Sequence, residues 1–592
     1  MNSPFEPVTP MTKQGLASSL AQMMARLRHG LGITATGLVL GVVVAYAALA
    51  SFGAVEVLLS LWQPDHEPGQ IGWHGFKPIL FLVPTLSGLA IGGLLIWLTP
   101  RRPVELADVI HAAHEPDPVV SRTGGYVSLL KSVMAIGAGS TTGLYGPLVV
   151  LGASLAASTK RLLNLSPQYA EMALGAGVAA AISAAFSAPL AGIIFAHEVV
   201  LRHYNLRFFA PVSLASATAY VFSGEVLNQH ISILPIFETR MAGPMDILML
   251  MLLGVVAGLA AVGVMRFVAR LRLRLVSAAL PIWLQPALAG LSMGILAHFA
   301  PSILGPGLDT ISAMMQGEIA PTALLVLLVF KVVAAGICLT LFFHGGIVAP
   351  ALFIGAGLGG VMAGLLSLLA PMTGYAPDTA LFVLAGMSAM ASSMLGAPLA
   401  VILLSFELSQ NYAATTAIVV TIVISNLLSS RLSTRSVFEP QLLAKGVDLS
   451  LGRESLALQQ TPVTELMSAD YLTLPASVSV NQATEKMAEA HCSEAHLLDG
   501  EGQWAGKICL YDLVRQPADA MCLPLQERTP LILQAHDNAL YAQTAMRDFL
   551  GEGVPVLKSG VLVGIIHEAD LFAHARMVTR SAWQHDHDDA VH

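Results

Sequence analysis

The chain has 592 residues, of which 55% are hydrophobic and only 11% are charged, and its mean hydropathy is +0.69. This composition excludes an ordinary soluble enzyme and indicates a membrane protein with several spans. The formal net charge of −8 says little about what such a protein would carry.

The N-terminal segment is polar and amphipathic for about 30 residues before the first apolar run, and it contains Lys13, Arg26 and Arg28. A cleavable signal peptide has a much shorter charged region, so we expect residues 1–30 to be a cytoplasmic arm. Basic residues, among them Arg431, also follow the last apolar run. By the positive-inside rule, both termini are expected to face the cytoplasm.

The region 31–440 predicts an all-α polytopic membrane domain. A helix needs roughly 20 apolar residues to cross a hydrocarbon core of ~30 Å. Several apolar stretches are too long, or too often interrupted by Gly and Pro, for one simple helix, and such breaks are tolerated only where the backbone is buried or lines a cavity. The stretches lie near 33–61, 78–98, 125–157, 171–200, 207–222, 244–266, 283–300, 320–342, 346–370, 378–408 and 414–430.

An internal repeat runs through this region. "AGVAAAISAAFSAPLAGIIFAHEVV" (176–200) matches "AGMSAMASSMLGAPLAVILLSFELS" (385–409), so that Glu198 answers Glu407. Upstream, "GPLVVLGASLAA" (146–157) matches "APALFIGAGLGG" (349–360) in the same order. Chance similarity of small-residue helices is the alternative. Two matches in one order favour two inverted repeats, about 31–225 and 244–440, of the transporter type.

Two turns, "GLYGP" (143–147) and "HGGIVAP" (344–350), place glycines just before a proline that suits the first turn of a helix. A helix that begins inside a membrane leaves its first N–H groups unpaired and carries about half a positive charge there, which attracts an anion. A tight helix crossing is the alternative for each turn. The predicted anion-binding residues are Leu144, Tyr145 and Gly146 at the first turn and Gly346, Ile347 and Val348 at the second.

The C-terminal region 455–578 is ordinary mixed sequence and predicts a separate α/β domain of two similar halves. "AGKICLYDLV" (505–514) and "VGIIHEADLF" (563–572) each give a strand followed by an acidic residue that opens a helix. The region resembles a tandem pair of CBS modules. A Ser or Thr that helps hold a nucleotide in that family is replaced here by Cys509 and His567, so a structural or dimer-supporting role is favoured over nucleotide binding. The His/Asp-rich tail 579–592 is expected to be disordered.

The remaining residues do not point to an enzyme. No nucleophile–base pair or metal-ligand cluster is visible, so neither catalytic residues nor a metal or other cofactor is expected. The cysteines show no paired or metal-ligand spacing and are expected to be reduced thiols: Cys338, Cys492, Cys509 and Cys522.

From about residue 30 to 445 the chain resembles the CLC family of chloride channels and chloride/proton antiporters. The resemblance is carried by "GLYGP", "HGGIVAP", "SAPLAG", "GAPLAV" and "SVFEPQLLAKG" (436–446), and a tandem CBS tail is common in that family. It implies a homodimer in a bacterial inner membrane, with one anion pore per subunit. The implied partners are chloride, other small anions and the lipid bilayer, but no nucleic acid.

The departures from the family pattern concern its functional residues. Tyr145 stands in place of the gating glutamate, and Val199 falls at the proton-transfer glutamate. Phe438 replaces the anion-coordinating tyrosine and is expected by this resemblance to be a seventh anion-binding residue, and aligning the serine motif on its proline puts the coordinating serine at Pro100. The resemblance therefore implies an anion path that has lost both ends of the family's proton route and the hydroxyl donors of the inner site.

These departures lead us to expect a passive, proton-uncoupled chloride channel in which Tyr145 is the gate. A phenol with a pKa near ~10 stays neutral, so it can donate a hydrogen bond or narrow the path but cannot carry protons. His344, before the second turn, could add pH sensitivity. One alternative is an antiporter that reroutes protons through His197 or Glu198, although the equivalence of Glu198 and Glu407 favours two structural caps. Another is a non-conducting sensor that reports through the CBS domain.

Overall fold

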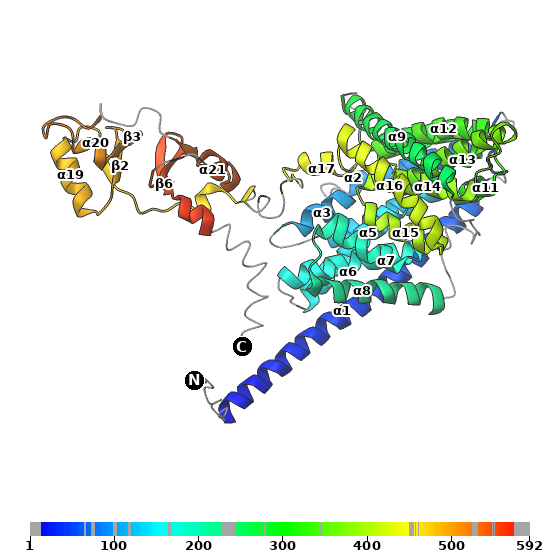
Figure 1. Cartoon of the computed structure of the whole chain (residues 1–592), viewed down its shortest axis with the longest axis horizontal. Helices are drawn as coiled ribbons and strands as arrows, with labels where there is room; N and C mark the ends of the chain where they lie inside the picture. The colour runs from blue at the N-terminus through cyan, green and yellow to red at the C-terminus, as the bar shows by residue number, and fades with distance from the viewer. Residues whose placement is uncertain are drawn as a thin grey trace. The chain divides into compact units, whose positions relative to one another are not determined.

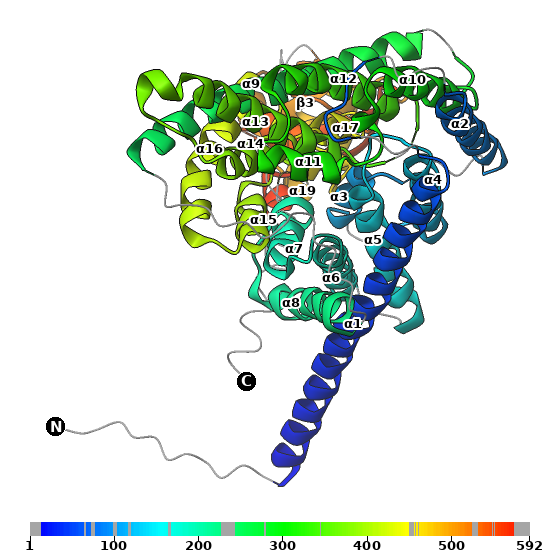
Figure 2. The same ribbon diagram turned by 90° about the vertical axis from the view of Figure 1, so that its right-hand side faces the viewer.

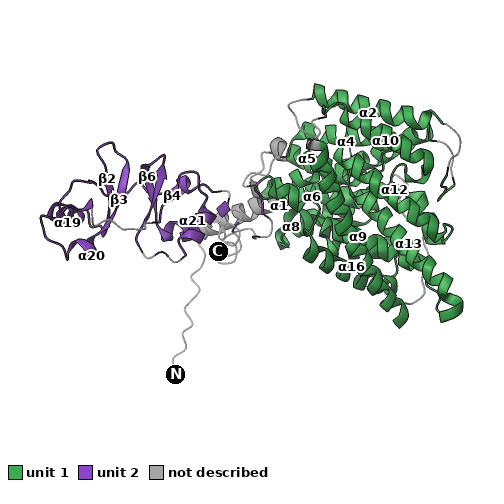
Figure 3. Cartoon of the chain, turned by 90° about the horizontal axis from the view of Figure 1, so that it is seen from above, with its two compact units in different colours: residues 1–445 green, residues 446–592 purple. Residues whose placement is uncertain are grey.

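The computed structural model gives the chain as two compact units, Met1–Lys445 and Gly446–His592, which Figure 3 shows in different colours. Each unit is described here by itself. The residues that the structure describes are 13–63, 67–72, 77–98, 104–115, 120–163, 167–226, 243–277, 280–343, 345–448, 451, 455, 458–459, 461–523, 531–547, 549 and 551–573.

The first unit is helical throughout its described residues, as the composition predicted (Figure 1). Its first half holds α1 (Lys13–Ser60), α2 (Ile79–Trp97), α3 (Leu106–Ala113), α4 (Arg122–Gly137), α5 (Tyr145–Leu163), α6 (Pro167–Phe186), α7 (Pro189–Phe195), the π-helix η1 (Ala196–Leu201), α8 (Leu206–Val221) and the π-helix η2 (Phe222–Val226). Its second half holds α9 (Pro244–Ser277), α10 (Gln285–Phe299), the 3₁₀ helix η3 (Pro301–Ile303), α11 (Leu308–Gln316), α12 (Pro321–Thr340), α13 (Val348–Thr373), α14 (Thr379–Leu395), α15 (Pro398–Ser409), α16 (Tyr412–Leu432) and α17 (Glu439–Leu443).

Among the described residues, 7 helices are long and apolar enough to cross a membrane, and several shorter apolar helices lie between them. The shorter ones arise where the glycine- and proline-rich stretches break. The stretch 125–157 divides into α4 and α5, and the stretch 378–408 divides into α14 and α15 at Gly396, which has φ 68°. The predicted all-α membrane fold with broken helices is confirmed.

Helix α1 is longer than the first apolar stretch. It begins at Lys13, inside the segment 1–30 that we expected to be an arm, and runs without interruption into the apolar residues. Figure 2 shows it lying beside α6 and α8, with which it packs. The N-terminal arm is therefore helical from Lys13 onward.

The two halves pack their matching helices in the same way. In the first half α5 packs on α6, and a Cβ on Gly152 would lie 2.2 Å from the carbonyl oxygen of Gly177. In the second half α13 packs on α14, and a Cβ on Gly355 would lie 2.3 Å from the carbonyl oxygen of Gly386. These four glycines are equivalent in the aligned repeats, so the sequence repeat is also a repeat of helix packing.

Replacing Gly355 with alanine is expected to lower the stability of the membrane unit by about 1–3 kcal/mol, because the added methyl group must push α13 away from α14. Gly263 on α9 is the matched control, since nothing lies within 4 Å of its Cβ direction. Alanine there is expected to be neutral or to stabilise the helix by up to about 1 kcal/mol. Thermal unfolding in detergent measures both. Equal effects of the two substitutions would contradict the close contact.

The second unit consists of two half-domains of one topology. In the first, β1 (Thr473–Pro475) pairs parallel to β2 (Glu494–Leu498), and β2 pairs antiparallel to β3 (Trp504–Cys509). In the second, β4 (Leu533–Gln534) pairs parallel to β5 (Val554–Lys558), and β5 pairs antiparallel to β6 (Val561–Ile566). The helix between the parallel strands is α19 (Val480–Glu489) in one and α21 (Ala539–Ala545) in the other, and the unit also contains two single-turn helices, η4 (Val463–Glu465) and α20 (Leu510–Leu513).

Local sequence accounts for the hairpin that closes the second half-domain. Ser559 and Gly560 join β5 to β6 with φ of 52° and 86°. Two successive residues with positive φ match the twist of antiparallel strands, and such turns favour glycine. The predicted α/β domain of two similar halves is confirmed.

Candidate functional site

The two glycine–proline turns meet in the folded chain. The Gly143 N–H donates to the Gly346 carbonyl at 3.0 Å, and the Gly346 N–H donates to the Gly143 carbonyl at 2.6 Å, as an antiparallel bridge. A Cβ on Gly346 would lie 2.9 Å from the Gly146 nitrogen. Only glycine allows backbones to approach this closely. Segments about 200 residues apart in the repeat are thus held together by their own backbones.

A helix begins at each turn. The first intrahelical bond of α5 runs from the Leu148 N–H to the Leu144 carbonyl at 2.9 Å, and that of α13 from the Ala351 N–H to the Ile347 carbonyl at 3.0 Å. The amides before Leu148 and Ala351 therefore have no carbonyl acceptor within their own helix. Both positive helix ends lie beside the glycine bridge, which makes this a favourable place for an anion.

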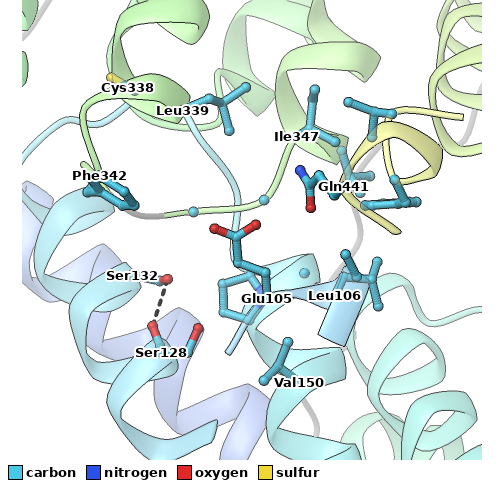
Figure 4. A pocket seen from close by; sticks show the side chains of 18 of the residues that line it. Glu105, Leu106, Ser128, Ser132, Val150, Cys338, Leu339, Phe342, Ile347 and Gln441 are labelled. Carbon is cyan, nitrogen blue, oxygen red and sulfur yellow. Dashed lines mark hydrogen bonds between the residues drawn. The ribbon is translucent and has the colours of Figure 1, made fainter. Parts of the chain in front are cut away.

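A cavity of about 140 Å³ opens beside the bridge (Figure 4). One water needs roughly 10–15 Å³ by this measure, so the space suits an ion with some of its hydration. Five of the seven predicted anion-binding residues line it: Gly146, Gly346, Ile347, Val348 and Phe438. The structure brings these residues together, and their role in binding an anion stays a prediction.

Tyr145, the predicted gate, does not line this cavity. Its ring is 2% exposed and stacks on Phe186 of α6, with ring centroids 4.1 Å apart and an interplanar angle of 16°. Phe52 of α1 lies on another side at 6.1 Å between centroids. Leu144, also predicted to bind an anion, is likewise 2% exposed and does not line the cavity. The tyrosine ring is thus packed against aromatic side chains of two helices.

The aromatic pair lies next to a second, smaller space. Phe186 lines an apolar cavity of about 30 Å³, and Val348 lines both this cavity and the larger one. Tyr145 directly precedes Gly146 of the large cavity and stacks on Phe186 of the small one. The stacked rings therefore lie beside residues that line the two cavities.

The structure describes only some of the other residues predicted at the anion site. Phe438 is the N-cap of α17, is 7% exposed and presents an apolar ring to the cavity. Pro100, aligned with the family's serine, and His344, expected as a pH-sensitive neighbour, lie outside the described residues. Phe438 therefore contributes no hydroxyl donor to the described part of the site.

Glu198 and Glu407 cap each other's helices. The Glu198 carboxylate accepts the backbone N–H groups of Leu399 at 3.0 Å and Ala400 at 2.8 Å, at the start of α15. The Glu407 carboxylate accepts those of Leu190 and Ala191, both at 2.8 Å, at the start of α7. Each carboxylate satisfies N–H groups of the equivalent helix in the other repeat. This exchange links the repeats by an approximate two-fold relation and engages both carboxylates structurally.

Val199, at the family's proton-transfer position, is 2% exposed within η1. A polar chain lies close to it in sequence. His197 Nδ1 is 2.8 Å from the His203 carbonyl oxygen, and His203 Nε2 is 3.1 Å from a carboxylate oxygen of Glu171. Nε2 of His197 is buried and makes no hydrogen bond among the described residues. Titratable groups are therefore present near η1, although not at Val199 itself.

Sequence reasoning missed the polar residues of the large cavity. Glu105, Ser128, Ser132, Arg272 and Gln441 line it together with the two turns. One sequence feature could have pointed to Glu105. It follows closely after the proline on which the family's serine motif is aligned, and it immediately precedes the amphipathic helix α3. Arg272 and Gln441 carry no comparable signal, because they come from distant helices.

In the second unit, the residues at the nucleotide positions contact groups of the unit itself. The Cys509 Sγ is 4.0 Å from a Glu494 carboxylate oxygen, and His567 Nδ1 is 2.6 Å from the Glu552 carbonyl oxygen. Glu494 also pairs with Lys507 at 3.2 Å and accepts N–H groups from the loop before β5. These contacts tie the two half-domains together. Within the described parts of the chain, no group of three His, Cys, Asp or Glu residues could hold a metal ion.

Solved structures of similar fold cover most of the chain. A slow cyanobacterial Cl⁻/H⁺ antiporter matches with a TM-score of 0.62 and 20% identity, over 70% of this chain and 98% of that chain. A eukaryotic CLC transporter matches with a TM-score of 0.59 and 17% identity, over 92% of this chain and 98% of that chain. At these identities the likeness establishes the fold.

Sequence comparison assigns the chain to a family. The family model described as "Voltage gated chloride channel" matches residues 87–430. A protein of Ralstonia nicotianae described as a putative chloride channel protein ClcB-like is 28% identical over 385 residues, which span 63% of this chain and 88% of the relative. Together with the broken helices and the meeting of two helix N-termini, these matches show that the chain belongs to the voltage-gated chloride channel (CLC) family.

Proposed function

We propose that this CLC protein is a passive, proton-uncoupled anion channel, with chloride as its principal ion. The observation that carries the proposal is Tyr145, a neutral aromatic residue at the helix start where the family has its gating glutamate. A phenol cannot compete with chloride as an anionic side chain, and it exchanges no proton near neutral pH. Without those two properties the family's coupled exchange has no carrier at this position.

The surrounding residues support the same proposal. Val199 cannot titrate, and Glu198 beside it is engaged with the amides of α15. An anion in the large cavity would be held by the N–H groups at the starts of α5 and α13, with Phe438 giving only an apolar wall. Selection for negative charge would then depend on backbone dipoles rather than on a titrating carboxylate at the turn.

A chloride/proton antiporter is the second candidate. The chain formed by Glu171, His203 and His197 favours it, because these groups lie near the position where the family transfers protons. That route would still lack a titratable group at Tyr145, where the proton must meet the anion. The channel therefore fits the residues better.

The remaining features of the proposal concern assembly. We propose a homodimer in a bacterial inner membrane with both termini in the cytoplasm, as the resemblance and the distribution of basic residues imply. The second unit is proposed to be structural or dimer-supporting, because Cys509 and His567 occupy its nucleotide positions and contact neighbouring residues. Neither feature changes the predicted anion path within one subunit.

Chloride efflux from liposomes that contain the purified protein tests the function. Valinomycin sets the voltage, and the external pH is recorded without a protonophore. Fast chloride loss with no proton movement is the expected result, and empty liposomes are the control. Proton uptake in fixed ratio to chloride would mean an antiporter instead, and its loss in Glu198→Gln would assign the proton route. No chloride movement at any pH would favour a non-conducting sensor.

A further inference from the structure

One carboxylate faces the cavity that holds the predicted anion-binding amides. Glu105 immediately precedes α3, is partly buried and lines the same cavity as Gly146 and Gly346. Figure 4 shows its carboxylate in the cavity, between Ser128 on one side and Gln441 on the other. A negative charge in this place opposes the electrostatic preference that the two helix N-termini create.

The charged neighbours of Glu105 compensate it only in part. Asp108 accepts the Glu105 backbone N–H through Oδ2 at 2.7 Å and pairs with Lys445 through Oδ1, so this aspartate and this lysine are largely committed to each other. Arg272 reaches the cavity from α9. Burial raises the pKa of the Glu105 carboxyl, and Asp108 adds to this, against the opposing effects of Arg272 and Lys445. The net direction is upward, toward the neutral form.

Other titratable groups lie on the elements around α3 and the cavity; among them, Cys338 lines the same cavity, and the Nζ of Lys131 is buried without a hydrogen-bond partner among the described residues. Glu198 accepts amides of α15, and Glu439 accepts the Arg435 N–H. None of these contacts reaches the Glu105 carboxylate. The titratable groups on the neighbouring elements include His197 and Glu198 on η1, Arg202 at its C-cap, Lys131 on α4, Cys338 on α12 and Glu439 on α17.

We propose that Glu105 is a proton-operated gate of the anion cavity: its carboxylate form excludes anions from the Gly146 and Gly346 amides, and its protonated form admits them. This proposal rests on the proposed anion path through that cavity. Protonation adds one proton to one carboxylate oxygen and removes its charge, so the cavity keeps only the positive field of the two helix ends and of Arg272. The gate lies on the α17 side of the path and is separate from Tyr145.

The geometry also explains why a carboxyl group can be kept here. The Glu105 N–H is held by Asp108 in a capping box, in which the Glu105 side chain faces the Asp108 backbone N–H in return, so the residue is fixed at the start of α3. The cavity is large enough for the carboxyl to share it with water or an ion. The path would then conduct more readily as the pH falls on the side of the cavity lined by α17, with no proton required to cross the membrane.

Chloride binding to the detergent-solubilised full chain tests the gate directly, by calorimetry at pH 5.5 and 7.5. Wild-type protein is expected to bind chloride about tenfold to a hundredfold more tightly at pH 5.5, since the neutral fraction of one carboxyl changes about tenfold per pH unit above its pKa and the two pH values are two units apart. Glu105→Gln should bind equally at both pH values and at the tighter level. Glu105→Asp, which keeps a carboxyl, should retain a pH dependence. Glu115→Gln, at an exposed residue just beyond the C-terminal end of α3, is the matched control and should behave as wild type.

Two further measurements keep the proposal open to refutation. Arg272→Gln removes a cation that favours the charged form, so it should move the midpoint of the pH dependence upward, and it does so without touching Glu105. Efflux from liposomes at the same two pH values reports conduction separately. A pH dependence that persists in Glu105→Gln, or that is absent from wild type, would overturn the gate. Binding that follows the predicted pattern without any efflux would support the gate and overturn the channel.

Discussion

Replacing Tyr145 with alanine is expected to raise chloride efflux by about tenfold or more. Lowering the barrier to conduction by about 1.4 kcal/mol would produce a tenfold change. The ring of Tyr145 is stacked on Phe186, which lines the small apolar cavity, and Tyr145 directly precedes Gly146, which lines the large one. Removing the ring would open space beside both cavities without adding a charge. The measurement is the initial rate of efflux per protein from liposomes at fixed voltage and pH.

Tyr145→Phe is the matched control because it keeps the stacked ring and removes only the hydroxyl. If the ring limits flux, phenylalanine should leave efflux near the wild-type rate; if the hydroxyl donates to the anion, efflux or selectivity should change with phenylalanine as well. Removing a buried aromatic ring typically costs about 3–5 kcal/mol of stability, so thermal unfolding must be recorded for each variant. An alanine variant that folds but conducts at the wild-type rate would show that the ring does not limit conduction.

Replacing Glu198 with alanine is expected to destabilise the membrane unit by about 3–5 kcal/mol, because two N–H groups lose a charged acceptor and hydrogen bonds to charged groups contribute about 1.5–3 kcal/mol each. Glu407→Ala should cost a similar amount, since its carboxylate makes the reciprocal pair of bonds to Leu190 and Ala191. The measurement is thermal unfolding in detergent. The physical cause is the same for both: the start of a helix is left without its cap.

The two substitutions also separate a structural role from proton transfer. Glu115→Ala, at an exposed residue just beyond the C-terminal end of α3, is the control and should have little effect on unfolding. Protein that remains folded with Glu198→Ala should still release chloride without proton movement. Wild-type stability together with a loss of proton coupling would contradict the cap and favour an antiporter that uses Glu198.

Much of the fold could be predicted because its signals are local. Apolar length indicated the membrane unit, and glycine before proline indicated where α5 and α13 begin. The turn at Ser559 and Gly560 follows from the few residues that accept positive φ. The alignment that matched Glu198 with Glu407 favoured structural caps, and the hydrogen bonds of both carboxylates agree with that interpretation.

The candidate site was harder to predict from the sequence than the fold was. The turns that meet were identified, but Glu105 was passed over, although it lines the cavity with them. Tyr145 was expected at the anion, whereas its ring packs on Phe186 and Phe52, outside the cavity lining. A sequence pattern shows which residue types occur at a turn, but the direction of a side chain depends on which neighbours leave room for it.

The sequence by itself determined the membrane class, the two repeats and the positions of the broken helices. These features depend on residue types and spacings within one or two turns of chain, where hydrophobicity and backbone preference act directly. Only the tertiary structure decided that each repeat's glutamate caps the other repeat's helix and that the ring of Tyr145 packs against Phe186. It also decided that Glu105 and Arg272 share a cavity with Gly146 and Gly346. Those contacts join residues from about 40 to more than 200 positions apart, and they exist only once close glycine contacts have set how the helices cross.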